Sequence, residues 1–213
     1  MLLEEAKWIA RELEPLLTDS THTVLDVGSS TEEFRRLDQP YIDYHVFRPL
    51  SHRGVSVVHV DRKAAPGVDV AVDLERTSVL PNELRGRGDV VVCSNLLEHC
   101  NDRHTVIRHL GEMTRPTGYL IVTVPKLFPF HADPIDTLYR PSPKDLARDF
   151  HEQFSAVTLA TIAASPGVFA VRDGPNWRVA SRVARSLLWR IRNGVRMPFV
   201  ALVSGAVLLR KQS

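Results

Sequence analysis

Seven predominantly apolar runs along the chain are predicted as strands, and stretches of helical or polar character separate them. The strands are expected over residues 23–28, 56–61, 68–73, 89–94, 118–124, 154–162 and 199–210. The fourth run, DVVVCS, is nearly all apolar, which is typical of a strand buried on both faces of a parallel sheet. Strands that alternate with helices indicate an α/β protein with a largely parallel sheet.

Helical periodicity is clearest before the first strand and between later ones. In residues 2–17 apolar side chains recur every three or four positions with charges between them, which predicts a leading amphipathic helix. A second helix is expected over 103–113. Ser142 and Pro143 have the residue types of an N-cap and a first helical turn, and they predict a third helix that runs to Phe150.

The length of 213 residues and the ordinary composition, 44% hydrophobic and 24% charged, favour a single domain. Within residues 1–213 we expect a lead-in helix in 1–20, a core in 21–165, and a basic helix with the last strand in 166–213. The first residues are acidic where an export signal would be basic, and the two cysteines are too few for a disulfide framework. A cytoplasmic location is therefore expected.

Charge is distributed unevenly along the chain. No acidic residue follows Asp173, and the eight basic residues beyond it give this tail +8 and leave −6 for the remainder. Residues 177–196 have the pattern of a basic amphipathic helix, for which packing on the sheet is favoured and peripheral contact with an anionic membrane stays open. Nucleic acid is not an expected partner, because the remainder is acidic and contains no recognised reading module. A homodimer stays open.

The turn after the first strand has the residues of a ligand-binding loop. Gly28 allows a tight turn and close backbone approach, and Ser29 and Ser30 are small. Such turns bind either dinucleotides or S-adenosylmethionine. The dinucleotide fingerprint lacks two of its three glycines here, and Glu32 and Glu33 would repel a pyrophosphate. The cationic S-adenosylmethionine tolerates these acids and is the favoured ligand.

Aspartates end the first three predicted strands, where ligands bind in parallel α/β sheets. The Asp61 carboxylate suits two ribose hydroxyls, and Asp73 suits an adenine amino group, with Leu74 packing the ring. Asp26 is the weakest member, since it has the alternative role of holding the first turn. A single aspartate at a strand end is usually a turn former or helix cap. Together the three favour a cofactor site.

Four stretches resemble the class I S-adenosylmethionine-dependent methyltransferases, in particular small type-11-like proteins associated with glycan or natural-product biosynthesis. They are VLDVGSS (24–30), VVHVDRKAAPGVDVAVDLE (57–75), DVVVCSNLLEHC (89–100) and GYLIVTVP (118–125). The resemblance implies a doubly wound, Rossmann-like, seven-stranded mixed sheet with six parallel strands and an antiparallel last one. The cofactor residues that it implies are Asp26, Gly28, Ser29, Ser30, Asp61, Arg62, Asp73, Leu74, Asn95, Leu96 and His99.

The chain departs from this family at the first motif. Ser30 and Glu32 replace the usual glycines, and residues 35–54, which contain two prolines, are not expected to form one continuous helix. These departures motivate a second hypothesis, a catalytically silent methyltransferase-like accessory or scaffold module. For His99, a partly exposed position on the following helix is an equal alternative to a role at the cofactor.

Candidate chemistry lies in residues 125–141, which leave the fifth strand at the cofactor end. His131 is the first candidate for a general base, oriented by Asp133 or Asp136, and Arg140 is suited to anchoring an anionic acceptor. The alternatives are a divalent metal site and a rigid turn in which Arg140 pairs with Asp136. A metal-free site is favoured. We therefore expect methyl transfer, most simply to oxygen, on a small-molecule, sugar or lipid-linked acceptor.

Overall fold

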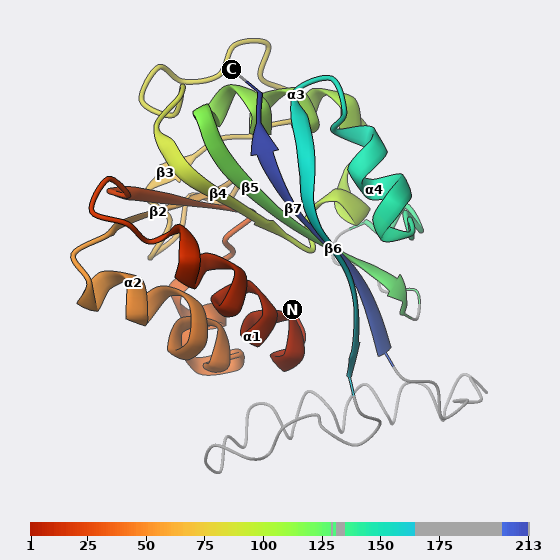
Figure 1. Cartoon of the computed structure of the whole chain (residues 1–213), viewed down its shortest axis with the longest axis horizontal. Helices are drawn as coiled ribbons and strands as arrows, with labels where there is room; N and C mark the ends of the chain where they lie inside the picture. The colour runs from red at the N-terminus through yellow and green to blue at the C-terminus, as the bar shows by residue number, and fades with distance from the viewer. Residues whose placement is uncertain (129, 131–134, 165–201, 213) are drawn as a thin grey trace.

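A seven-stranded sheet forms the centre of the computed structural model, which describes residues 1–128, 130, 135–164 and 202–212 (Figure 1). The described strands are β1 (Thr23–Val27), β2 (Ser56–Asp61), β3 (Val70–Ala71), β4 (Gly88–Ser94), β5 (Thr114–Leu127), β6 (Phe154–Ala164) and β7 (Leu202–Lys211). Their order is β3-β2-β1-β4-β5-β7-β6. All pairs from β3 to β5 are parallel, whereas β7 runs antiparallel to both β5 and β6. The predicted doubly wound mixed sheet is confirmed.

The short β3 is the main difference from the predicted strands. Residues 68–73 were expected to be extended, but only Val70 and Ala71 pair with β2. At the start of the pairing, the Asp69 carboxylate accepts the His59 N–H at 2.8 Å, so a side chain takes the place of a backbone partner. The strand therefore shortens without leaving this β2 donor unsatisfied.

The described helical elements agree with the expected periodicity. They are α1 (Leu3–Leu13), α2 (Arg48–His52), α3 (Arg103–Met113), α4 (Pro143–Asp149), the 3₁₀ turns η1 (Glu14–Leu16) and η4 (Leu97–His99), and the π turns η2 (Phe34–Asp38) and η3 (Asp43–Phe47). As expected, residues 35–54 are not one helix. The leading helix ends earlier than 17 because Pro15 lies in the 3₁₀ turn that follows it.

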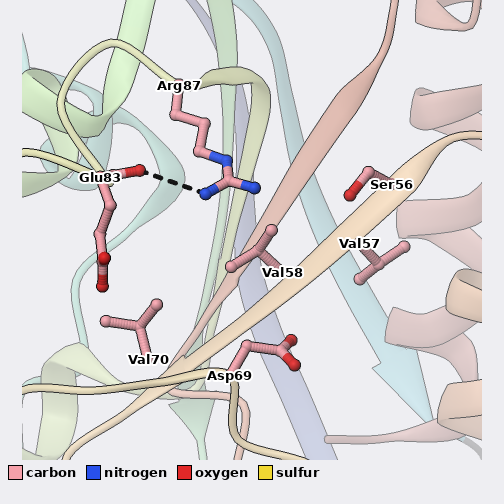
Figure 2. A pocket seen from close by; sticks show the side chains of 7 residues that line it. All are labelled: Ser56, Val57, Val58, Asp69, Val70, Glu83 and Arg87. Atoms are coloured by element: carbon pink, nitrogen blue, oxygen red, sulfur yellow. Dashed lines mark hydrogen bonds between the residues drawn. The ribbon is translucent and has the colours of Figure 1, made fainter.

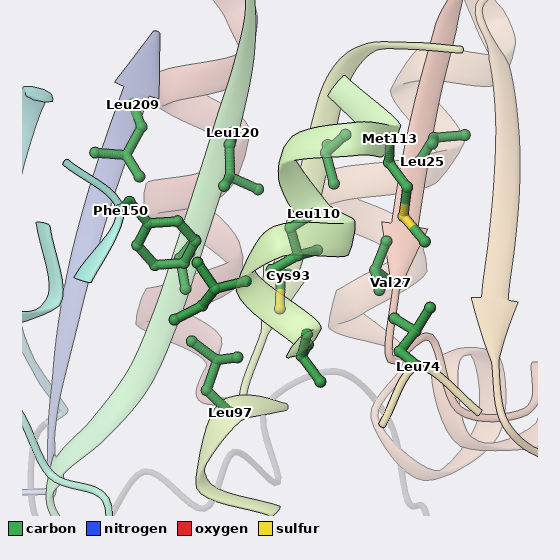
Figure 3. Close-up of a cluster of buried hydrophobic side chains, with 14 of the residues drawn as sticks. Leu25, Val27, Leu74, Cys93, Leu97, Leu110, Met113, Leu120, Phe150 and Leu209 are labelled. Carbon is green, nitrogen blue, oxygen red and sulfur yellow. The ribbon is translucent and has the colours of Figure 1, made fainter. Parts of the chain in front are cut away.

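Helices cover both faces of the sheet, and each face has its own apolar core (Figure 1). On one face, Leu110 and Met113 of α3 and Phe150 after α4 pack with Leu120 and Leu209 of the sheet (Figure 3). On the other face, Trp8, Ile9 and Leu13 of α1 pack in a second cluster with residues of η3, α2 and the sheet. This double cover explains why β4 is buried on both sides.

Several predictions lie outside the described residues. These are the basic amphipathic helix at 177–196, with its membrane and partner alternatives, and the candidate groups His131 and Asp133. Within the described part of the chain, no helix combines the length and the apolar character needed to cross a bilayer.

Candidate functional site

The turn after β1 closes against the tips of its two neighbouring strands. The Gly28 and Ser29 N–H groups both donate to the Val60 carbonyl of β2, at 2.8 and 3.1 Å. Gly28 has a φ of +77°, and a β-carbon there would lie 3.1 Å from the Leu96 β-carbon beyond β4. Glycine is required because the backbone both adopts a left-handed conformation and approaches Leu96 closely.

The Asp61 carboxylate ends β2 and is fixed by two backbone groups. One oxygen accepts the Ser30 N–H at 2.8 Å, and the other accepts the Lys63 N–H at 3.0 Å. Ser30 has a φ of +55°, unusual for a non-glycine residue, so the family's preference for glycine at this position has a conformational reason. A carboxylate has about four acceptor positions, so two stay available for ribose hydroxyls. Arg62, beside it, is exposed.

Asp26 has a partner within the sheet. Its carboxylate lies 2.9 Å from Nδ1 of His59, the residue opposite it in the β1–β2 register, and both side chains are largely buried. This contact links two strands below the turn. It favours the structural alternative for Asp26 over direct cofactor contact.

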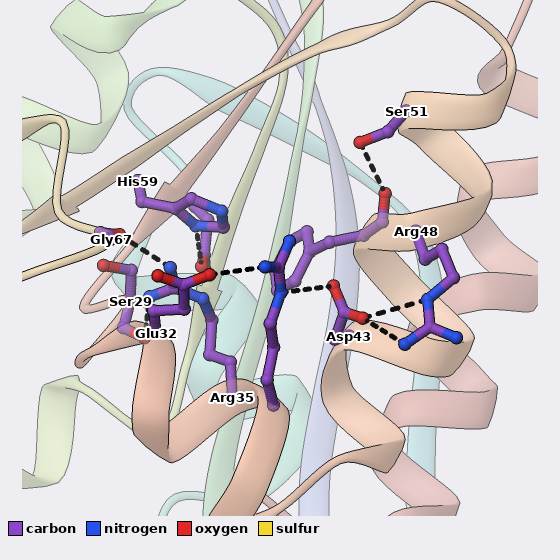
Figure 4. Close-up of polar contacts among 11 residues, drawn as sticks. Ser29, Glu32, Arg35, Asp43, Arg48, Ser51, His59 and Gly67 are labelled. Atoms are coloured by element: carbon purple, nitrogen blue, oxygen red, sulfur yellow. Dashed lines mark hydrogen bonds and ion pairs between the residues drawn. The ribbon is translucent and has the colours of Figure 1, made fainter.

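Arg35 is a structural part of the site that sequence patterns did not indicate. Its buried guanidinium donates to the carbonyls of Ser29 (3.0 Å), Ser30 (2.8 Å) and Gly67 (2.6 Å), and so ties the first turn to the loop after β2 (Figure 4). Burial lowers the pKa of Arg35, and the nearby Asp26 carboxylate opposes that shift. One arginine among several in a polar segment gives no sign in the sequence that it is buried.

Glu32, a departure from the family pattern, lies against the same loop. Its N–H donates to the Pro66 carbonyl at 3.0 Å, and its carboxylate pairs with Arg36 at the surface. Gly67 packs directly against Glu32: a β-carbon added at Gly67 would lie only 2.4 Å from the Glu32 β-carbon. Gly67 therefore permits the first turn and the β2 loop to meet.

Gly67→Ala is expected to destabilise the protein more than Gly54→Ala. Both glycines have φ near +75°, a conformation that costs an L-residue about 1–2 kcal/mol, but only the Gly67 substitution also meets backbone and side-chain atoms. Overpacking adds roughly 1–3 kcal/mol. Urea denaturation of the two variants measures the difference. Equal losses would show that contact with Glu32 is not a constraint.

Asp73 and Leu74 follow β3 at the same edge. The Asp73 carboxylate is partly exposed, accepts the Glu75 N–H at 3.1 Å and lies 3.7 Å from Arg76. Leu74 is buried in the core that contains α3, and its carbonyl lies 3.1 Å from Nδ1 of His109. The Asp73 carboxylate thus lies at the surface, on the side where the adenine is expected to bind, whereas the Leu74 side chain is part of the core.

Asn95 connects the tip of β4 to β5 and to the leading helix. Its backbone has a φ of +50°, its N–H donates to the Thr123 carbonyl at 2.9 Å, and its side-chain amide donates to Glu5 at 3.1 Å. Glu5 is buried and also accepts the Leu2 N–H. The start of α1 therefore lies over the tips of β4 and β5.

The segment 135–140 is held against η4. The N–H and hydroxyl of Thr137 donate to the Glu98 carbonyl at 2.8 and 3.0 Å, and Nδ1 of His99 contacts the Ile135 carbonyl. His99 is therefore a partly buried residue that anchors this segment.

The predicted Arg140–Asp136 pair is present at 2.6 Å, with both side chains largely buried. Arg140 in this arrangement stabilises the segment, as the rigid-turn alternative expects. Among the described residues no set of three or more His, Cys, Asp or Glu side chains is arranged to hold a metal ion. Two of the three residues of the metal alternative, His131 and Asp133, lie outside the described residues.

Glu98 is the buried acid that sequence patterns did not single out. Its side chain is fully buried, and neither carboxyl oxygen has a hydrogen-bond partner among the described residues. Burial raises the pKa of Glu98 to about 8, and the neighbouring Glu5 adds to that shift. The sequence context LLEH gave the one available signal, a charged residue inside an otherwise apolar stretch at a strand tip.

A pocket of about 380 Å³ lies elsewhere, at the edge of the sheet (Figure 2). It is lined by the first residues of β2, by Asp69 and Val70 at the start of β3, and by Glu83 and Arg87. These residues are at the amino ends of the strands. The pocket is therefore separate from the strand tips described above.

Comparison with known proteins agrees with this geometry. The structure resembles a SAM-dependent methyltransferase from Archaeoglobus fulgidus (17% identity, TM-score 0.57, covering 99% of this chain and 95% of that chain). It also resembles 1,6-didemethyltoxoflavin-N1-methyltransferase from Burkholderia thailandensis (14%, 0.54, 99% and 78%) and phosphoethanolamine N-methyltransferase 2 from Haemonchus contortus (11%, 0.56, 98% and 52%). No curated protein matches the sequence.

The strand order with an antiparallel β7 is thus the class I methyltransferase fold. The sequence model described as a methyltransferase domain matches residues 3–185, and the chain belongs to that family. The resemblance to the methyltransferases found in the sequence is therefore confirmed.

Proposed function

We propose that this protein transfers the methyl group of S-adenosylmethionine to a hydroxyl of a small-molecule, sugar or lipid-linked acceptor, in a cytoplasmic biosynthetic pathway. The observation that carries the proposal is the Asp61 carboxylate, held at the tip of β2 by the Ser30 and Lys63 amides beside the left-handed Gly28 turn.

The donor set at the strand tips fits this cofactor. Asp61 retains acceptor positions for two ribose hydroxyls, Gly28 provides close backbone approach, and Asp73 provides a carboxylate at the adenine side. Glu32 does not add its charge to the turn, because its carboxylate pairs with Arg36 at the surface. When bound, S-adenosylmethionine supplies an activated methyl carbon, and the protein has to position the acceptor and exclude water.

The acceptor is proposed to bind where α1, η4 and the segment 135–140 meet. Asn95, Glu5 and Glu98 bring an amide and two buried carboxyl groups to this region. An acceptor hydroxyl needs a group that takes its proton, which contributes about 10²–10⁴-fold to the rate. His131, oriented by Asp133 or Asp136, is the candidate for this role that the sequence predicts, and Glu98 is a second candidate. Arg140 is proposed to stabilise the segment 135–140 through its ion pair with Asp136.

Calorimetric titration tests the cofactor part of the proposal. We expect saturable binding of S-adenosylmethionine and of S-adenosylhomocysteine by the full chain, and no binding of NAD⁺, because the turn lacks the dinucleotide glycines and carries Glu32 and Glu33. Absence of both heat and a thermal shift with S-adenosylmethionine would favour the scaffold hypothesis instead.

A product assay tests the acceptor part. The protein is incubated with S-adenosylmethionine and panels of phenolic, sugar and lipid-linked hydroxyl compounds, with matched primary amines in parallel, and methylated products are detected by mass spectrometry. We expect methylation in the hydroxyl panel. If only the amines are methylated, nitrogen rather than oxygen is the methylated atom. Two structural neighbours have names that state N-methylation for those proteins.

A further inference from the structure

Three buried polar groups that lack hydrogen-bond partners come from elements that meet at the tips of β4 and β5. Among the described residues these are both carboxyl oxygens of Glu98, the Thr123 hydroxyl and Nε of Arg140. The elements are joined directly, because Asn95 bonds to Thr123 and Thr137 bonds to Glu98 through their backbones. Buried polar groups are normally satisfied, so this concentration indicates a place for a polar ligand.

Glu98 is distinguished from the other buried acids nearby by its unsatisfied oxygens. The Asp26 carboxylate contacts His59, the Asp136 carboxylate pairs with Arg140, and Glu5 accepts from Asn95 and Leu2. Nε2 of His99 lies 3.8 Å from a Glu98 carboxyl oxygen, which is too long for a hydrogen bond. Among the described residues, no side chain of another residue therefore forms a hydrogen bond with the buried Glu98 carboxyl.

The electrostatic surroundings of Glu98 come from several elements. The charged and titratable groups that act on it or respond to it are Glu5 and the Met1 amino group from the start of the chain, Arg140, His99, Cys93 and Cys100. Burial, the largest influence, raises the pKa to about 8, and Glu5 adds to the shift, whereas the backbone N–H of Glu98 itself, the Met1 amino group and Arg140 oppose it. Near neutral pH the group exists in both protonation states, as proton transfer requires.

We propose that Glu98 binds the acceptor hydroxyl and takes up its proton during methyl transfer. This rests on the proposed function. The acceptor O–H bond breaks and its proton passes to a Glu98 oxygen, while the acceptor oxygen forms a bond to the methyl carbon. The carbon–sulfur bond breaks with its electron pair remaining on sulfur, so the products are the methyl ether and neutral S-adenosylhomocysteine.

The kinetic test compares Glu98→Gln with His131→Ala and with the exposed control Glu83→Gln, using the hydroxyl compound methylated in the product assay. Glu98→Gln should lower kcat about 10²–10⁴-fold while calorimetry shows unchanged S-adenosylmethionine binding. In the wild type and Glu83→Gln, kcat should rise with pH through a midpoint near 8, and this rise should vanish in Glu98→Gln. A wild-type kcat in Glu98→Gln, or loss of the rise in His131→Ala alone, would overturn the proposal.

A second measurement does not depend on an acceptor. Infrared difference spectra of wild type minus Glu98→Gln, recorded at pH 6.5 and 9.5, should show a protonated buried carboxyl at the lower pH that ionises at the higher. A carboxylate at both pH values would also overturn the proposal. Failure of the wild type to bind S-adenosylmethionine would instead contradict the proposed function, so the two failures are distinguishable.

Discussion

Asp61→Ala is expected to weaken S-adenosylmethionine binding about 30- to 150-fold. The substitution removes the charged acceptor that we propose for two ribose hydroxyls. Hydrogen bonds to charged groups contribute about 2–3 kcal/mol, which corresponds to this range of affinity. Ser30 and Lys63 would also lose the oxygen to which their N–H groups donate. Isothermal titration calorimetry of the two proteins gives the ratio of dissociation constants.

Two controls separate ligand contact from loop damage. Asp69→Asn alters another aspartate of the same region, one whose carboxylate accepts the His59 N–H at the sheet edge, and it should leave cofactor affinity unchanged. Asp61→Asn keeps one side-chain oxygen that can accept a backbone N–H. Its thermal unfolding midpoint should therefore fall less than that of Asp61→Ala, while its affinity for S-adenosylmethionine should still be lower than that of the wild type. Equal affinity in wild type and Asp61→Ala would remove Asp61 from the cofactor site.

Glu98→Gln is expected to make the folded protein more stable at alkaline pH. The pKa of Glu98 is raised to about 8 in the folded state from an ordinary value of 4.5. The folded state therefore binds more protons than the unfolded state between these values, and wild-type stability falls as pH rises from 4.5 to 8. At about 1.4 kcal/mol per unit of pKa difference, the loss amounts to several kcal/mol, which a neutral glutamine does not incur.

Urea denaturation at pH 5, 7 and 8.5 measures this difference. The free energies of unfolding of Glu98→Gln and wild type should be closest at pH 5 and should diverge progressively at higher pH, with the variant the more stable. Glu83→Gln, at an exposed position, should follow the wild type throughout. Parallel pH curves for wild type and Glu98→Gln would show that the Glu98 carboxyl is not buried in neutral form.

The parts of the molecule that depend on local pattern could be predicted from the sequence. The apolar DVVVCS run identified β4, and the placement of Gly28 and Asp61 after apolar runs located the strand tips, because parallel strands present their carboxyl ends at one edge. The Ser142 cap was also found, since its hydroxyl accepts the Asp145 N–H at 3.3 Å. These features require only nearby residues.

The parts that depend on tertiary contacts could not be predicted. Asp26 contacts His59 because the β1–β2 register places them opposite each other, and no register can be derived from one strand alone. Arg35 is buried because three carbonyls from two loops converge on it. Glu98 is buried where Thr137 of the segment 135–140 bonds to its carbonyl, a contact that its neighbours in sequence do not reveal.

A crystal structure of the full chain with bound S-adenosylhomocysteine would test whether the strand tips bind the cofactor. We expect the ribose hydroxyls within hydrogen-bond distance of the Asp61 carboxylate and the sulfur directed toward the β4 tip at Asn95. A ligand bound elsewhere, such as in the pocket between Ser56 and Arg87 at the sheet edge, or a ribose without contact to Asp61, would contradict it.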